Sequence, residues 1–258
     1  MSSLYLNADL HPDAFTVGAR LPIWGADARH AAQVARVRTG ERIGVGDGKG
    51  RLAWGRVVHV AQGEVAIEAE EIVLEERTGP RIVLVQALAK GDRDELAIQA
   101  ATELGVHAVV PWQAARSVSV WKGDKVEKGL ERWRSVVREA SKQAIRPSVP
   151  EVRPLVSTKE LAAHLRGSSS GEAAYRDSAI LVLEPTALVS LVSIRPSDYS
   201  TRESVILVVG PEGGIAPEEL RELELAGAQL VRLGPEVLRT STAGPAAIAA
   251  LAVLLGRW

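Results

Sequence analysis

The sequence predicts an α/β protein in two parts, a small β-barrel followed by a domain built on a largely parallel sheet. Before residues 75–80, short β-prone runs are separated by glycine turns, which is typical of a small barrel. Beyond this point, apolar strand patterns alternate with helix patterns, which favours a parallel sheet. We therefore expect one domain over residues 1–76 and a second over residues 77–258.

The strands expected in the first domain cover residues 42–45, 52–60 and 64–72. Residues 44–48, GVGDG, have the GxGxG spacing of a nucleotide-binding loop. Such a loop needs a helix after its glycines, whereas the next residues, RLAWGRVVHV, have the pattern of a strand. Asp47 and Gly48 therefore predict a hairpin turn rather than a nucleotide site.

The strands expected in the second domain cover residues 82–87, 108–111, 179–183, 205–209 and 229–233. Between them, residues 92–104 predict a helix that begins with a capping box formed by Asp92 and Glu95 and ends at Gly105. Ser157 and Glu160 predict another capping box, before a helix that ends near residue 165. Residues 167–178, GSSSGEAAYRDS, predict a mobile loop.

A longer helix is expected over residues 125–145, with Pro147 as its stop. Its apolar face is formed by Leu130, Trp133, Val137 and Ala140. The same helix is rich in lysine and arginine, but glutamates are interleaved with them. This pattern favours a solvated helix face over a nucleic-acid surface.

Two glycine- and proline-rich loops are the strongest sign of a functional site. LVVGPEGGIAPEEL (207–220) and LGPEVLRTSTAGPAAIAAL (233–251) each predict a buried strand that ends in a loop and leads into a helix. Ligand pockets of α/β proteins form at such strand ends. Gly210, Gly213 and Gly214 allow a flat ligand to approach the backbone, although the first loop alone is equally typical of a tight turn. The polar residues 239–242 of the second loop favour a shared pocket.

The two loops together resemble the signature of SPOUT-class RNA methyltransferases, and most closely that of the RsmE family, which methylates N3 of a uridine in small-subunit ribosomal RNA. Residues 30–50, 84–118 and 132–152 resemble further segments of the family in the same order. The chain departs from the family at Ser241, where an acidic residue is usual, and at Gly244-Pro245, which replaces a pair of small apolar residues. We expect Pro245 in the first turn of its helix, where proline is tolerated.

The resemblance implies a SPOUT-type methyltransferase domain with a C-terminal trefoil knot, preceded by a small PUA-like β-barrel that binds RNA. It also implies a homodimer, S-adenosyl-L-methionine as cofactor, and 16S ribosomal RNA or the assembled small subunit as partner. By the same resemblance, the expected cofactor-binding residues are Leu183, Glu184, Gly210, Pro211, Glu212, Gly213, Gly214, Leu233, Gly234, Leu238, Arg239, Thr240, Thr242 and Ala243.

The reaction implied is direct methyl transfer to a ring nitrogen, for which the enzyme aligns the reacting atoms and excludes water. Uracil N3 carries a proton that must leave, so a nearby base helps, and Glu212 is the candidate. Arg239 is the second catalytic candidate, because a guanidinium can stabilise negative charge on the uracil oxygens or bind a phosphate. The alternative for Arg239 is an internal ion pair with Glu212.

The net charge of −1 gives no sign of RNA binding, which depends on local basic patches. Basic residues with few neighbouring acids gather near the N-terminus, and two more lie at the start of the second domain. The expected RNA-binding residues are Arg29, Arg36, Arg38, Lys49, Arg51, Lys90 and Arg93.

Composition excludes several classes of protein. The chain has no cysteine, which rules out disulfides, thiolate metal sites and a cysteine nucleophile, and its five histidines are too scattered to indicate a metal site. A secretory signal and an apolar run of the roughly 20 residues needed to span a membrane are both absent, so we expect a soluble cytoplasmic protein without a membrane partner. Two alternatives remain: a SPOUT methyltransferase for another RNA, such as transfer RNA, or a non-catalytic RNA-binding module.

Overall fold

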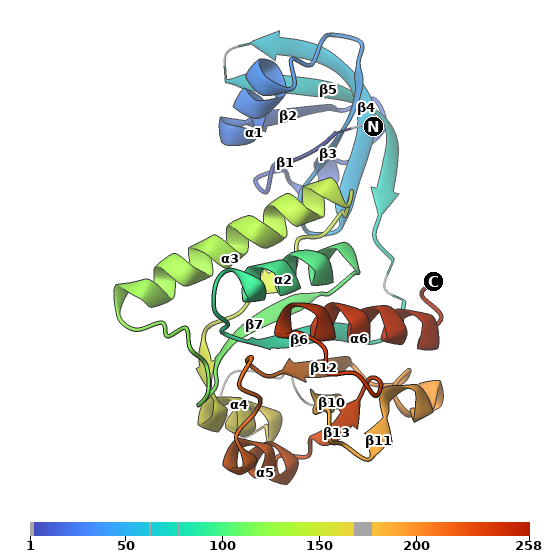
Figure 1. The fold of residues 1–258 in the computed structure, drawn as a ribbon. Helices are drawn as coiled ribbons and strands as arrows, with labels where there is room; N and C mark the ends of the chain where they lie inside the picture. The colour runs from blue at the N-terminus through green and yellow to red at the C-terminus, as the bar shows by residue number, and fades with distance from the viewer. Residues whose placement is uncertain (1–2, 62, 77, 168–176) are drawn as a thin grey trace. The chain divides into compact units, whose positions relative to one another are not determined.

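The computed structural model describes residues 3–61, 63–76, 78–167 and 177–258, and divides the chain into two compact units (Figure 1). The first unit combines residues 1–77 with residues 138–149, and the second combines residues 78–137 with residues 150–258. The long helix α3 (Asp124–Gln143) therefore contributes to both units. The return of residues 138–149 to the first unit was not predicted from the sequence.

The first unit is a five-stranded sheet in the order β1-β3-β4-β5-β2. Its strands are β1 (Leu4–Leu6), β2 (Arg20–Trp24), β3 (Arg42–Gly46), β4 (Arg51–Ala61) and β5 (Glu64–Leu74). The pairing is antiparallel except between β1 and β3. Asn7 Nδ2 donates to the carbonyl oxygen of Pro22 at 2.8 Å and so connects the end of β1 to β2, the two outer strands of the sheet.

Short helical segments complete the first unit. They are a 3₁₀ turn (Pro12–Ala14) and the helix α1 (Gly25–Arg29), which continues as a π-helical turn (His30–Val34). The predicted hairpin is confirmed, because β3 and β4 pair antiparallel and Asp47 Oδ1 accepts the N–H groups of Lys49 and Arg51 at 2.7 and 3.0 Å. The GVGDG segment is therefore not followed by a helix.

A buried carboxylate ties the C-terminal half of α3 into the first unit. Asp27 accepts hydrogen bonds from the Leu6 N–H at 2.9 Å, from Arg138 Nη2 at 2.7 Å and from Lys142 Nζ at 3.1 Å. Burial alone would raise the pKa of Asp27, but the Leu6 hydrogen bond and the two cations outweigh it and lower the pKa. Asp27 thus joins β1, α1 and α3 through its charged form.

The second unit is an eight-stranded sheet, and the pairings between its described strands are parallel, as predicted. Its order is β11-β13-β10-β12-β6-β7-β8, with β9 also paired to β7. The strands are β6 (Arg81–Ala87), β7 (Ala108–Gln113), β8 (Glu151–Val152), β9 (Val156–Ser157), β10 (Ser178–Leu183), β11 (Val189–Ser190), β12 (Ser204–Val209) and β13 (Gln229–Arg232).

Helices cover both faces of this sheet (Figure 1). The helices α2 (Arg93–Glu103) and α6 (Thr240–Leu254) lie together on one face, and α4 (Thr158–Leu165) and α5 (Pro217–Leu225) lie together on the other. Two 3₁₀ turns, Leu191–Ser193 and Pro196–Asp198, lie between β11 and β12. Burial on both faces explains why the central strands are apolar at almost every position.

Several local predictions for the second unit are confirmed. The five predicted strands appear as β6, β7, β10, β12 and β13. The apolar face predicted for α3 is buried at all four positions. Ser157 and Glu160 form the predicted capping box at the start of α4.

The predicted capping box at the start of α2 is wrong. Asp92 is in the left-handed region, at φ 58°, after Gly91 at φ 62°, and its side chain makes no capping hydrogen bond. Asp94 stabilises this turn instead, because its carboxylate accepts the N–H groups of Ala89 at 3.3 Å and Glu95 at 2.9 Å. Burial raises the pKa of Asp94 even though these hydrogen bonds oppose it.

The position predicted for Pro245 is also wrong. Pro245 lies inside α6, beyond its first turn, where the proline leaves a backbone carbonyl of the helix without its usual donor. The preceding glycine has a packing role, because a Cβ on Gly244 would lie 3.0 Å from Leu84 Cδ1. Glycine at this position lets α6 approach β6 closely.

The predicted mobile loop over residues 167–178 lies largely outside the described residues. Within the described parts of the chain, none of the helices is long and apolar enough to cross a membrane. The same parts contain no cluster of histidine and carboxylate side chains that could hold a metal ion.

Asp27→Asn should destabilise the first unit by about 2 kcal/mol at neutral pH, because the two cations lose their shared partner. The folded-state pKa of Asp27 is lowered from 3.8, so its contribution is present above that pH and is lost as the pH falls below it. Urea unfolding of both proteins should therefore show a difference in unfolding free energy at neutral pH that shrinks as the pH is lowered below 3.8. A difference that does not change with pH would contradict the role of the charged form.

Candidate functional site

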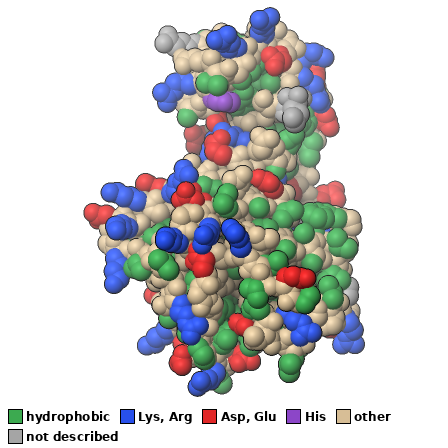
Figure 2. All heavy atoms as spheres, viewed as in Figure 1, with side chains coloured by type: hydrophobic (Ala, Val, Ile, Leu, Met, Phe, Trp, Pro, Cys, Tyr) green, Lys and Arg blue, Asp and Glu red, His purple; other side chains and the backbone are tan. Residues whose placement is uncertain are grey.

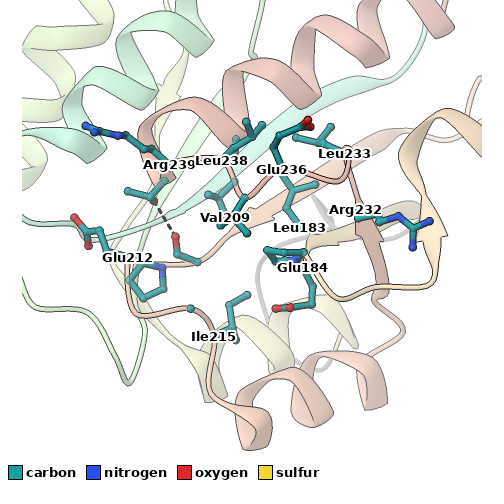
Figure 3. Close-up of a pocket in the computed structure, with 18 of the residues that line it drawn as sticks. Leu183, Glu184, Val209, Glu212, Ile215, Arg232, Leu233, Glu236, Leu238 and Arg239 are labelled. Atoms are coloured by element: carbon teal, nitrogen blue, oxygen red, sulfur yellow. Dashed lines mark hydrogen bonds between the residues drawn. The ribbon is translucent and has the colours of Figure 1, made fainter.

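A pocket of about 350 Å³ lies at the carboxyl ends of β10, β12 and β13, entirely within the second unit (Figure 3). This is where ligand sites of parallel α/β sheets form. The residues that line it are Arg93, Leu183, Glu184, Pro185, Val209, Gly210, Pro211, Glu212, Gly214, Ile215, Val231, Arg232, Leu233, Gly234, Glu236, Val237, Leu238, Arg239, Thr240 and Ala243.

Strand register brings the pocket together. Leu183 at the end of β10 pairs with Val209 of β12 on one side and with Val231 of β13 on the other. Three strands therefore end at the same level, and the chain leaves each of them through a loop. In Figure 3 the side chains of Leu183, Val209 and Leu238 lie on one side of the pocket, and Ile215 lies on the opposite side.

Glycines shape the first loop, at residues 210–216. A Cβ on Gly210 would lie 2.6 Å from Ile215 Cγ1, so only glycine leaves Ile215 in its place against the pocket. Gly214 has φ +71°, a conformation that favours glycine, and its N–H donates to the carbonyl oxygen of Pro211 at 2.9 Å. The loop is therefore a closed turn with Ile215 directed into the pocket.

A chain of hydrogen bonds joins the two loops. Gln86 Nε2, on the buried strand β6, donates to Thr240 Oγ1 at 2.8 Å, and Thr240 Oγ1 donates to the carbonyl oxygen of Gly210 at 2.8 Å (dashed in Figure 3). Gln86 was not predicted as a site residue. A glutamine inside an otherwise apolar strand was the available signal, because a buried amide needs partners.

Glu212 is held in an ion pair at the rim of the pocket. Its Oε1 accepts from Arg93 Nη1 at 2.9 Å and from the Lys90 N–H at 3.1 Å. Partial burial would raise the pKa of Glu212, but backbone hydrogen bonds and Arg93 outweigh it and lower the pKa. Glu212 is therefore a weaker proton acceptor than an ordinary glutamate, and its ion-pair partner is Arg93 rather than Arg239.

Arg239 precedes α6 as its N-cap residue and is exposed. Its guanidinium has no ion pair or side-chain hydrogen bond with any residue that the structure describes. In Figure 3 Arg239 and Glu212 lie at the same end of the pocket, and Arg232 lies at the other end. Arg232 Nη1 donates to the carbonyl oxygens of Ala187 and Leu188 at 2.7 and 3.3 Å, so its role is to hold the connection after β10.

All of the predicted cofactor-binding residues line the pocket except Gly213 and Thr242. Gly213 lies against Arg116, and the Thr242 N–H donates to the carbonyl oxygen of Arg239 at 2.8 Å inside the first turn of α6. Pro185, Ile215 and Glu236 are among the lining residues that the sequence did not single out. Each is close in sequence to a predicted residue.

The predicted RNA-binding residues fall into two groups. Arg29, Arg36 and Arg38 are exposed on the first unit, and their guanidinium groups have no ion pair within the described residues. The others except Lys90 use their side chains for contacts inside the protein. These contacts are Lys49 Nζ to the Ala8 carbonyl oxygen at 2.9 Å, Arg51 to Asp47 at 3.2 Å and Arg93 to Glu212 at 2.9 Å.

Basic side chains also gather on the second unit, near the N-terminal end of α2 (Figure 2). Lys90 precedes this helix and is exposed, and Arg93 is its first residue. Because Glu212 connects Lys90 and Arg93 to the pocket, this basic surface reaches the pocket rim.

Comparison with known proteins places the chain in a family. The profile of an RNA methyltransferase domain matches residues 76–252, and that of an RNA methyltransferase PUA domain matches residues 25–70. Ribosomal RNA small subunit methyltransferase E of Mycobacterium bovis is 43% identical over 258 residues, which is 100% of this chain and 94% of the relative. The chain belongs to the ribosomal RNA small subunit methyltransferase E family.

Two further relatives agree with this assignment. The Bacillus subtilis protein of the same name is 33% identical over 230 residues, 89% of this chain and 88% of the relative. The crystal structure of the Neisseria gonorrhoeae enzyme bound to S-adenosyl methionine superposes with a TM-score of 0.83 at 28% identity, covering 98% of both chains. The resemblance predicted from the sequence is thus confirmed.

Gly210→Ala should weaken binding of S-adenosylmethionine at least about tenfold, because the new Cβ displaces Ile215 from the pocket. Calorimetric titration measures this, with circular dichroism to verify folding. The matched control is Gly210→Ala combined with Ile215→Ala, which removes the clashing atom. This double variant should bind as well as Ile215→Ala alone. If the double variant instead loses the sum of the donor binding energies lost by the two single variants, Gly210 does not act through Ile215.

Proposed function

We propose that this chain methylates N3 of a uridine in the 16S ribosomal RNA of the small subunit, with S-adenosylmethionine as methyl donor. As a member of its family the chain is an RNA methyltransferase. The observation that carries the proposal is the pocket formed by two hydrogen-bonded loops at the ends of β10, β12 and β13. The specificity for N3 rests on the sequence resemblance to the RsmE family, and the names of the relatives support methylation of small-subunit ribosomal RNA.

The pocket fits the donor in size and in chemistry. Its volume of about 350 Å³ is in the range of small-ligand sites. Apolar side chains such as Leu183 and Ile215 beside glycine backbone suit a flat adenine ring, and carboxylates of Glu184 and Glu236 suit a cationic donor. We propose that the cofactor-binding residues predicted from the sequence act here, with Gly213 and Thr242 supporting the loops from outside the pocket.

The donor supplies an activated methyl group, so the chain's own task is to align it with the nucleotide and exclude water. Arg239 is suited to stabilise negative charge on the uracil oxygens or to bind a neighbouring phosphate, since its guanidinium is exposed at the pocket rim. Glu212 as the proton acceptor stays a prediction. Its lowered pKa favours a second role, holding the glycine loop against Arg93.

We further propose the SPOUT fold with a C-terminal trefoil knot, a homodimer and a cytoplasmic site of action. The knot and the dimer rest on the sequence resemblance to the family. We also propose that residues 1–76 form the PUA-like RNA-binding domain and residues 77–258 the methyltransferase domain.

We propose that the RNA surface includes Arg29, Arg36 and Arg38. Their side chains form no ion pair with an acidic residue in the described parts of the chain. Lys49, Arg51, Lys90 and Arg93 stay candidates from the sequence. The three arginines are favoured because a cation without an internal partner is available to a phosphate.

The proposed reaction is tested by nucleoside mapping. The purified chain is incubated with labelled S-adenosylmethionine and either small subunits or transfer RNA from a strain that lacks the gene. Digestion and mass spectrometry should find N3-methyluridine at one position of 16S RNA. Methylated transfer RNA would favour another RNA substrate, and an unmethylated product with intact RNA binding would favour a non-catalytic module.

Arg239→Ala should lower turnover by about 10²-fold while donor affinity stays unchanged. The reason is that its guanidinium lies at the pocket rim and forms no hydrogen bond or ion pair that would hold the loop to another of the described residues. Single-turnover methylation and calorimetry measure the two effects separately, with Arg239→Lys as the matched control, which should recover part of the rate. Loss of donor affinity and of thermal stability together would show that Arg239 is structural.

Changing Arg29, Arg36 and Arg38 to Glu should weaken RNA binding and reduce the slope of log affinity against log salt by about 2. Three phosphate contacts of a single strand are expected to contribute that much. Donor affinity, measured in parallel, should stay the same, because the pocket lies in the second unit. If the slope keeps its wild-type value, the RNA surface lies elsewhere.

A further inference from the structure

The glycine turn of the pocket contacts an arginine that was not predicted from the sequence as a site residue and does not line the pocket. Arg116, in the connection between β7 and α3, donates from Nη1 to the carbonyl oxygen of Gly213 at 3.1 Å. Its Cβ and Cδ lie 3.3 and 3.7 Å from the position that a Cβ of Gly213 would take. Gly213 does not line the pocket, so Arg116 supports the turn from outside.

The backbone that carries Arg116 is itself anchored. The Ala115 N–H donates to Glu219 Oε1 at 2.9 Å, and the Ser117 N–H donates to the Ala114 carbonyl oxygen at 3.0 Å. Glu219 is 7% exposed and also accepts from the Ala216 N–H and from the Thr158 hydroxyl. Arg116 is therefore fixed relative to the start of α5, the helix that the glycine turn leads into.

The other residues of the turn have supports of their own. Gly210 is held through Thr240, and Glu212 through Arg93 and the Lys90 N–H. Gly213 lies beyond these contacts, and its carbonyl oxygen is held by Arg116. Three loops at the carboxyl edge of the sheet thus each hold one point of the turn.

The contact needs a long cationic donor. Arg116 is exposed and has no ion pair within the described residues, so an acidic partner does not explain its conformation. A guanidinium that donates to a carbonyl oxygen makes a charge-assisted hydrogen bond, which is stronger than a neutral one. The methylene groups of the same side chain pack on Gly213, whose lack of a side chain leaves room for them.

We propose that Arg116 is a positioning residue for methyl transfer, which fixes the carbonyl of Gly213 and thereby the turn on which the donor lies. This inference rests on the proposed function of the pocket. Loss of Arg116 lets the turn adopt other conformations, and the donor must then select the competent one. The donor KM consequently rises more than kcat falls.

The experiment is calorimetric titration of S-adenosylmethionine into the full chain without RNA. Arg116→Ala should bind the donor about tenfold more weakly, the scale of one charge-assisted hydrogen bond. Arg116→Lys, which keeps a donor of similar reach, should recover part of the affinity. Lys122→Ala removes a charge from the same connection without touching the turn and should bind as the wild type does. Kinetics with RNA should show the KM effect.

Unchanged donor affinity in a folded Arg116→Ala protein would overturn the proposal. If that variant instead loses RNA affinity and salt dependence while it binds the donor normally, Arg116 is a phosphate contact and the proposal is equally wrong. A wild-type chain that fails to bind the donor at all would contradict the proposed function itself, and the inference with it.

Discussion

The site depends on the hydroxyl of Thr240, which accepts from the buried amide of Gln86 and donates to the carbonyl oxygen of Gly210. These residues come from β6, from the loop after β12 and from the start of α6. Gln86 and Thr240 are 154 positions apart in the sequence. Burying an amide is costly unless it is hydrogen-bonded, so the arrangement favours one register of α6 against the sheet. That register closes the second loop over the first.

The remaining contacts give the pocket its shape and charge. Gly210 leaves room for Ile215, Gly214 allows the turn, and Arg93 neutralises Glu212 at the rim. Arg239 is left exposed beside them. A site of this kind holds its loops in place before the ligand arrives, so less ordering is needed on binding. The chemistry of a donor that brings its own activated methyl group requires little more than such alignment.

Sequence reasoning succeeded where local pattern determines structure. The central strands β6 and β12 were predicted because they are apolar on both faces, and the two loops because glycine and proline follow the strands. Sequence reasoning failed where contacts between residues that are far apart in the sequence determine the local structure. Asp92 was expected to cap α2, but a left-handed turn places Asp94 there, and the contact between Arg116 and Gly213 joins residues 97 positions apart. Two-residue strands such as β8 and β11 have too little sequence to show a period.

The central claim is that residues 209–215 and 233–243 together form the donor site. Amide hydrogen exchange of the full chain, with and without S-adenosylmethionine, tests it most directly. The account predicts that exchange slows in both segments on addition of the donor, while amides of β4 and β5 in the first unit keep their rates. Slowing confined to the first unit, or in neither segment at saturating donor, would contradict it.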